Sequence, residues 1–210
     1  MPLWEHVIAM LREAMFGYAQ LTHGSLGAGI LVVSAVARLV LLPLSVRLGV
    51  AAARHQAAMA RLEPELDALR ARHKDNARML HAEMRALLAR EGLSMFPTTS
   101  VLGSVMQIPL FVALFSAVQQ VAARGGAFLW VRDLARPDWI VGAIASALAV
   151  AATLAGPQPA VDQRWLLVAV TTLITIVTLS QMASGVGLYW GASSAIGILQ
   201  AVLVNRRRPA

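Results

Sequence analysis

The chain contains no cysteine and little charge. Without thiols it cannot form disulfides, thiolate metal sites, cysteine nucleophiles or a lipid anchor on cysteine. Charged residues make up only 14% of the 210 residues, whereas 58% are hydrophobic. This balance lies well outside that of an ordinary soluble domain, and it indicates that the lipid bilayer is the solvent.

Motifs of enzymes are absent as well. The sequence has no glycine-rich phosphate loop, nucleophile elbow or metal-spaced histidine cluster, so it predicts neither an enzyme nor a bound cofactor or metal. A net charge of +7 is compatible with nucleic-acid binding, but that would require basic residues gathered on one water-exposed face. Here they flank apolar runs, as in membrane proteins, and we expect no nucleic-acid partner.

Apolar segments dominate the chain. Five of them approach the roughly 20 residues that a bilayer span needs: residues 25–46, 100–122, 139–155, 165–182 and 186–204. Residues 4–20 carry apolar side chains at helical spacing, which indicates an amphipathic helix that lies in the membrane interface or packs on the rest of the protein. Residues 47–94 are charged and alanine-rich, which predicts a polar hairpin of two helices. We therefore predict one all-α polytopic membrane domain over residues 1–210.

Local breaks set the predicted boundaries. The first span is expected to end near Pro43, and Pro64 is expected at a helix start or a kink. The polar run at residues 74–76 separates the two helices of the hairpin. A tight turn at residues 183–185 separates the last two spans.

The distribution of basic residues predicts the orientation. In a five-span chain the hairpin, Arg164 and the arginines of residues 206–208 lie on one side. The basic residues on the other side are fewer: Arg12, Arg124, Arg132 and Arg136. Because cytoplasmic loops are enriched in lysine and arginine, we place the hairpin and the C-terminus in the cytoplasm and the N-terminus outside. The protein is thus expected to be a multi-pass protein of the cell membrane.

Arg38 lies within the first predicted span, where a charge costs about 2.5–3.5 kcal/mol on insertion scales. The predicted spans contain no aspartate or glutamate, so a water-filled groove is the simplest way to solvate the guanidinium. The alternative is that Arg38 extends to the interface or is capped by helix carbonyls. Polar side chains from other spans either line such a groove or join helices by hydrogen bonds: Ser104, Gln107, Thr175 and Gln181.

The hairpin carries a set of large apolar side chains at Met59, Leu62, Met79 and Met84. Methionine adapts to irregular surfaces, so these residues are candidates for an apolar face that recruits a partner. The alternative is that they form the small core of the hairpin itself.

Short motifs occur in a fixed order along the chain. Arg38 precedes the Pro43-Leu44 pair, and four further stretches follow: residues 59–66 (MARLEPEL), 107–115 (QIPLFVALF), 128–138 (FLWVRDLARPD) and 184–190 (SGVGLYW). Together they resemble the YidC/Oxa/Alb family of membrane protein insertases, in its minimal five-span form. Ala183 departs from the pattern, because the family commonly has proline there.

The resemblance implies a hydrophilic groove, open to the cytoplasm and to lipid, in which Arg38 is the positive charge. The groove would receive the polar part of a nascent membrane protein while the hydrophobic segment passes into the bilayer. The implied partners are nascent membrane proteins and the lipid bilayer, with the ribosome and the Sec translocon as further candidates, and no cofactor. The residues alone leave two alternatives: a small-anion transporter or channel that uses Arg38, and a scaffold that holds a membrane complex through its hairpin.

Overall fold

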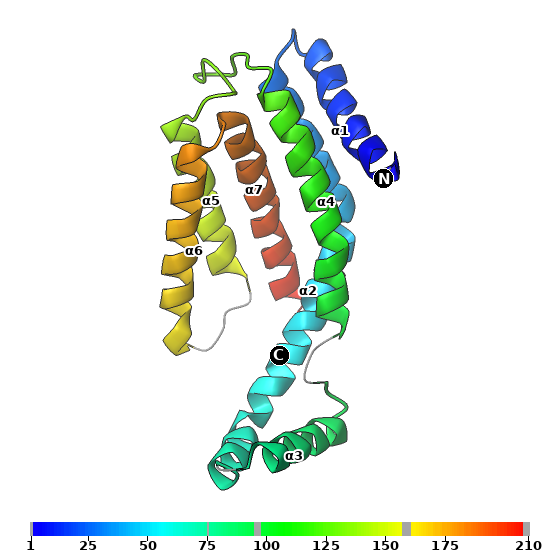
Figure 1. Ribbon diagram of the computed structural model, residues 1–210, viewed down its shortest axis with the longest axis vertical. Coiled ribbons are helices and arrows are strands. Elements are labelled where there is room, and N and C mark those ends of the chain that lie inside the picture. The colour runs from blue at the N-terminus through cyan, green and yellow to red at the C-terminus, as the bar shows by residue number, and fades with distance from the viewer. Residues whose placement is uncertain (1, 75, 95–97, 157–160, 208–210) are drawn as a thin grey trace.

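The structure is a computed structural model that describes residues 2–74, 76–94, 98–156 and 161–207. Helices make up almost all of these residues (Figure 1). Within these ranges, the side chains of residues 2–3, 98–106, 161–164 and 167 are not described. The helices are α1 (Pro2–Leu21), α2 (Leu26–Arg72), α3 (Ala77–Arg90), α4 (Thr98–Ala122), α5 (Trp139–Ala155), α6 (Val161–Gln181) and α7 (Ser184–Arg206). The predicted all-α class is confirmed, since the described residues hold only one isolated β-bridge.

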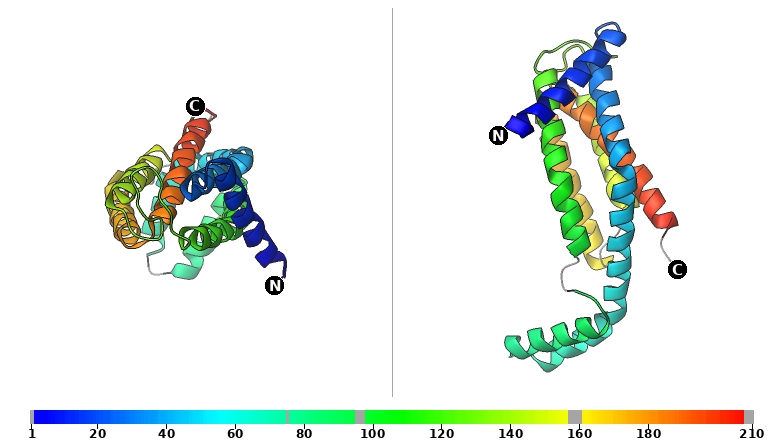
Figure 2. Two further views of the ribbon diagram at one scale, coloured as in Figure 1. Left: turned by 90° about the horizontal axis from the view of Figure 1, so that it is seen from above. Right: turned by 90° about the vertical axis from the view of Figure 1, so that its right-hand side faces the viewer.

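The first helix, α1, packs obliquely across α2 and α4 at one end of the bundle (Figure 2). Its buried face consists of residues at three- and four-residue spacing: Ile8, Leu11, Met15 and Ala19. The approach to α2 is close, because a Cβ atom on Gly29 would overlap with the carbonyl oxygen of Met15. The amphipathic helix is therefore present, and its position in a membrane interface stays a prediction.

The second helix, α2, is 47 residues long, about 70 Å at 1.5 Å per residue. It continues past Pro43, near which the first membrane span is predicted to end, and runs into the hairpin. Proline removes one backbone hydrogen bond, but the residues beyond it are held by tertiary packing, because Val46 and Ala53 form a buried cluster with Val204 of α7. The last part of α2, which contains Pro64, bends away from the bundle (Figure 2), as expected at proline.

The long helices form an open arc rather than a closed bundle. In the order α4, α2, α7, α5, α6, each helix contacts the next, and α4 also contacts α7. The two ends of the arc, α4 and α6, do not contact each other anywhere in the described ranges. Figure 2 shows this arrangement along the helix axes.

Two of the described helices, α2 and α7, are long and apolar enough to cross a membrane. The other three predicted spans coincide with shorter apolar stretches, Gln107–Ala122, Trp139–Ala155 and Val168–Gln181. The turn between the last two predicted spans, residues 165–182 and 186–204, is shorter than predicted, because α7 already begins at Ser184. The first residues of α7 are buried, so the chain must re-enter the bundle at once.

The hairpin lies clear of the arc, at the end that we call the hairpin end (Figure 1). Its two arms are the last part of α2 and the whole of α3, and α3 begins after Asn76, whose side chain accepts a hydrogen bond from the Met79 N–H. The predicted break between the arms is confirmed at this point. Leu62, Leu66 and Leu88 form a small core of their own, which holds the arms together.

A loop of residues 123–138 covers the opposite end, which we call the loop end. Backbone bonds attach it to the start of α7: the Gly185 N–H donates to the Leu134 carbonyl and the Ser184 N–H donates to the Arg136 carbonyl. Within the loop, Phe128 and Val131 exchange two backbone hydrogen bonds. The loop is therefore a braced structure, although it has almost no regular secondary structure.

Candidate functional site

The candidate site is centred on Arg38, which α2 places on the inner side of the arc next to α7. Its side chain is half-buried, and no carboxylate of the described residues lies within salt-bridge distance of it. The Tyr189 hydroxyl of α7 lies close enough to interact with the Arg38 guanidinium and with Ser193. Arg38 is therefore a cation without a counter-charge in the described structure.

Three buried hydroxyl groups lie on the two helices at this position. They belong to Ser34, one turn before Arg38 on α2, and to Tyr189 and Ser193, one turn apart on α7. Ser34 has no hydrogen-bond partner among the described residues, whereas the Tyr189 hydroxyl interacts with Arg38 and Ser193. Buried polar groups in proteins are almost always hydrogen-bonded, to protein or to water, so hydroxyls beside an uncompensated cation are typical of a hydrated, polar surface.

Aromatic side chains form a wall next to this polar cluster. Phe111 of α4 contacts Tyr189 and Trp190 of α7, with ring centroids 6.0 Å and 6.1 Å apart. It also stacks with Phe115, one turn further along α4, at 6.1 Å. These contacts fix α4 against α7 and leave the Tyr189 hydroxyl directed toward Arg38.

The side of the arc between α4 and α6 is open to the surroundings. Helix α6 contacts only α5 and, weakly, α7 in the described ranges, and much of its surface is apolar and exposed: Trp165, Leu166, Val170, Leu173, Ile174, Ile176 and Val177. Such a surface is stable only against lipid or another apolar partner. Helix α6, at the end of the arc, thus has an apolar outer surface.

The structure places the predicted groove residues in different surroundings. Gln107 is half-exposed on α4, whereas Thr175 is buried in α6 at 7% exposure. Gln181 is exposed and is the last residue of α6, at the loop end. The side chain of Ser104 lies outside the described residues. Within the described residues no hydrogen bond joins Gln107, Thr175 or Gln181 to Arg38, and their roles in a groove stay predictions.

The sequence reasoning did not select Ser34, Tyr189 or Ser193 as site residues. A signal was present for Ser34, because a spacing of four residues puts it on the same helix face as Arg38. Tyr189 and Ser193 share the same spacing with each other. No local signal pairs them with α2, because that contact joins segments far apart in the sequence.

In the hairpin, most of the predicted recruitment face points inward. Leu62 is in the hairpin core, and Met59 and Met84 pack against that core. Of the four residues only Met79 is largely exposed, at 49%. The hairpin core is therefore where three of these side chains lie, and a recruitment role for the set stays a prediction.

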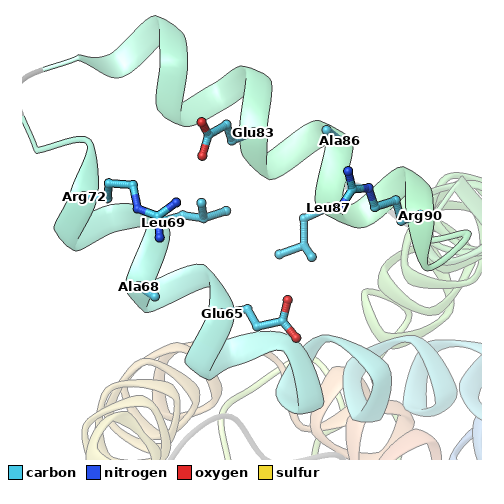
Figure 3. Close-up of a pocket in the computed structure, with 8 residues that line it drawn as sticks. All are labelled: Glu65, Ala68, Leu69, Arg72, Glu83, Ala86, Leu87 and Arg90. Atoms are coloured by element: carbon cyan, nitrogen blue, oxygen red, sulfur yellow. The ribbon is translucent and has the colours of Figure 1, made fainter.

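A second feature of the hairpin is a groove of about 460 Å³ between its two arms. Leu69 and Leu87 lie between the arms, and charged side chains surround them (Figure 3): Glu65, Arg72, Glu83 and Arg90. Glu83 also pairs with His73 at 3.0 Å, which ties the end of α2 to α3. The hairpin thus offers a small apolar surface edged by charges of both signs.

Comparison with known proteins shows the family to which this chain belongs. The family described as 60Kd inner membrane protein matches residues 18–210. Membrane protein insertase YidC 1 of Streptococcus pyogenes serotype M3 is 31% identical over 218 residues, covering 96% of this chain and 74% of the relative. The chain belongs to the YidC family.

Other members of the YidC family are similar over almost the whole chain. Membrane protein insertase YidC 2 of Lactiplantibacillus plantarum is 28% identical, and the alignment covers 99% of this chain and 78% of the relative. A crystal structure described as active YidC insertase with the first transmembrane domain resolved matches with a TM-score of 0.61 at 21% identity. That match covers 99% of this chain and 47% of the crystallised one, and it supports the same fold.

Proposed function

We propose that this protein is a membrane protein insertase that receives polar segments of nascent membrane proteins in a hydrophilic groove around Arg38. One observation carries the proposal: a half-buried arginine without a counter-charge lies beside the buried hydroxyl of Tyr189, with the buried hydroxyls of Ser193 and Ser34 one turn away on α7 and α2. An incoming polypeptide supplies carboxylates, carbonyls and water to such a surface. The names of its curated relatives are consistent with this role.

The groove lowers the barrier for a polar segment, because hydrocarbon offers no hydrogen bonds to an unfolded backbone. The gap between α4 and α6 gives the hydrophobic segment a route into lipid. Burial of that apolar segment in the bilayer then supplies the driving force. The proposed mechanism uses no bond chemistry and no nucleotide or other cofactor, and on this view the protein is not an enzyme.

We further propose that α2, α4, α5, α6 and α7 each cross the membrane, with the hairpin and the C-terminus in the cytoplasm. The excess of basic residues at the hairpin end supports this orientation. In that position the hairpin would meet clients first, and the ribosome and the Sec translocon are candidate partners there. Single cysteines at Met79 and Leu129, labelled with an impermeant maleimide from each side, test the orientation; labelling of Leu129→Cys from the cytoplasm would contradict it.

The decisive experiment reconstitutes the purified protein into liposomes and measures protease protection of a newly synthesised small membrane protein. We expect protein-dependent protection, and a loss of at least about tenfold in Arg38→Ala for clients with an acidic translocated segment, on the scale of a lost charged contact. Arg47→Ala is the matched control. It removes the same charge from the same helix nine residues away, on the opposite face.

Further variants separate charge from geometry. Arg38→Lys should retain most activity if only the positive charge matters, whereas a loss equal to that of alanine would assign the function to the directional hydrogen bonds of the guanidinium. If Arg38→Ala unfolds in detergent, Arg38 is structural. If no client is protected beyond the level of empty liposomes, the insertase proposal fails and a scaffold role leads. A protein-dependent anion flux abolished by Arg38→Ala would favour a transporter.

A further inference from the structure

We propose that the loop end carries a binding site for a single anionic phospholipid, with its phosphate in the loop and one acyl chain in a groove between α5 and α6. This site is separate from the groove around Arg38. The inference uses the membrane location of the chain, and it does not depend on the insertase activity.

The first half of the site is a cavity of about 440 Å³ in the loop of residues 123–138. Trp130, Arg132 and Arg136 line it, and both arginines are exposed. Arg132 has no ion-pair partner among the described residues, whereas Arg136 pairs loosely with Asp133 at 3.4 Å. Guanidinium groups bind phosphate oxygens in a bidentate manner, and tryptophan is enriched at the level of lipid headgroups.

Two carboxylates also line this cavity, and both have partners in the protein. Asp138 accepts hydrogen bonds from the Ile140 and Val141 N–H groups, at 3.0 Å and 2.9 Å, as the N-cap of α5. Asp133 accepts one from the Ala135 N–H at 2.9 Å, in addition to its contact with Arg136. Their charges are thus partly compensated, which leaves Arg132 as the group available to an anion.

The second half of the site is an apolar groove of about 700 Å³ between α5 and α6, which lie side by side (Figure 1). Small side chains on α5, including Ala143 and Ala147, make room for it, and Ile176 of α6 forms part of the other wall. The lining runs along α5 from Trp139 to Leu154, about 22 Å at 1.5 Å per residue. One leaflet is about 15 Å deep, so the groove accommodates a full acyl chain.

The two halves meet at consecutive residues, since Asp138 lines the cavity of the loop and Trp139 lines the apolar groove. A cavity with an arginine free of ion pairs, at the end of an apolar groove, matches a molecule with a phosphate at one end and a long hydrocarbon chain at the other. The surface beside them also suits the membrane interface, because Leu129 is 75% exposed and Trp139 is 79% exposed.

The backbone at residues 128–131, the tip of the loop, supports this assignment. Leu129 has φ of +53°, a left-handed conformation that is rare for large side chains and costs of the order of 1 kcal/mol. The bridge between Phe128 and Val131 holds the tip in place. The fold therefore keeps a large apolar side chain outside the protein in a strained conformation, which is favourable where that side chain enters lipid.

The test uses tryptophan fluorescence in liposomes. The full chain retains only Trp130 and Trp139, which lie in the two halves of the site, and the other three tryptophans are replaced by phenylalanine. It is reconstituted in phosphatidylcholine with traces of chain-brominated lipid. We expect brominated phosphatidylglycerol to quench the tryptophan emission with an apparent affinity about fivefold above that of brominated phosphatidylcholine, the factor that one arginine near an anionic headgroup provides. Equal quenching by the two lipids would overturn the proposal.

Three variants locate the two halves. Arg132→Ala should abolish the preference, and Arg124→Ala should keep it, because Arg124 is also at the loop end but lies over the Phe16 ring. Ala147→Phe should reduce quenching by both lipids, because it fills the apolar groove. If Arg124→Ala lowers the preference as much as Arg132→Ala does, the effect is general surface charge and the site does not exist. Unchanged quenching in Ala147→Phe would remove the acyl-chain half, and with it the proposal of a single lipid.

Discussion

The close packing of α1 on α2 gives a prediction that can be tested against a matched control. Gly29 lies where α2 meets α1, and an added Cβ would overlap with the backbone carbonyl of Met15. Gly17 lies near the C-terminal end of α1, and an added Cβ there meets nothing within 4 Å. We predict that Gly29→Ala separates α1 from the bundle, whereas Gly17→Ala leaves it in place.

The size of the effect follows from comparing the two variants. Alanine in a helix is favoured over glycine by about 0.5–1 kcal/mol, and this gain is common to both and cancels in the difference. What remains is the cost of overpacking, about 1–3 kcal/mol. A backbone carbonyl cannot rotate away as a side chain can, so we expect the upper half of this range. The docking equilibrium should therefore shift by about 30- to 150-fold between the variants.

The absence of native cysteine makes the assay simple. Ala19 is only 3% exposed on the buried face of α1, so Ala19→Cys provides a single thiol that reacts with maleimide only when α1 separates. The labelling rate should rise about 30- to 150-fold in Gly29→Ala relative to Gly17→Ala. Equal rates in the two variants would refute the reasoning, because they would show that α1 does not pack as closely as the structure indicates.

Two further variants test other parts of the fold. Leu88→Ala should destabilise the hairpin by about 2–5 kcal/mol, since Leu88 is 2% exposed in the hairpin core. Limited proteolysis should then cut the hairpin while the arc stays intact. The control Met79→Ala should behave as the unmodified protein. Asp138→Ala removes the N-cap of α5 and should lower the free energy of unfolding by about 0.5–2 kcal/mol. Asp138→Asn should retain most of the stabilisation by the cap. Equal losses of stability in the two variants would exclude a capping role.

Much of the fold was readable from the sequence because it depends on local composition and periodicity. The apolar runs, the charged hairpin and the break at residues 74–76 are properties of neighbouring residues, and the helices lie where these patterns put them. The helix continues past Pro43, near which the first span is predicted to end, for a nonlocal reason. Proline weakens a helix locally, but packing against Val204, far along the chain, stabilises α2 beyond it.

Arg38 could be selected from the sequence because a charge in an apolar run is costly whatever the fold. Its neighbours could not, since Tyr189, which also interacts with Ser193, reaches Arg38 only when α7 packs beside α2. The same holds for the hairpin methionines, whose inward orientation depends on how the two arms meet. The sequence by itself determined that the chain has a membrane-type composition, where its helices run and which charge required an explanation. Only the tertiary structure decided which groups surround that charge and that α4 and α6 stay apart, because both depend on contacts between residues distant in the chain.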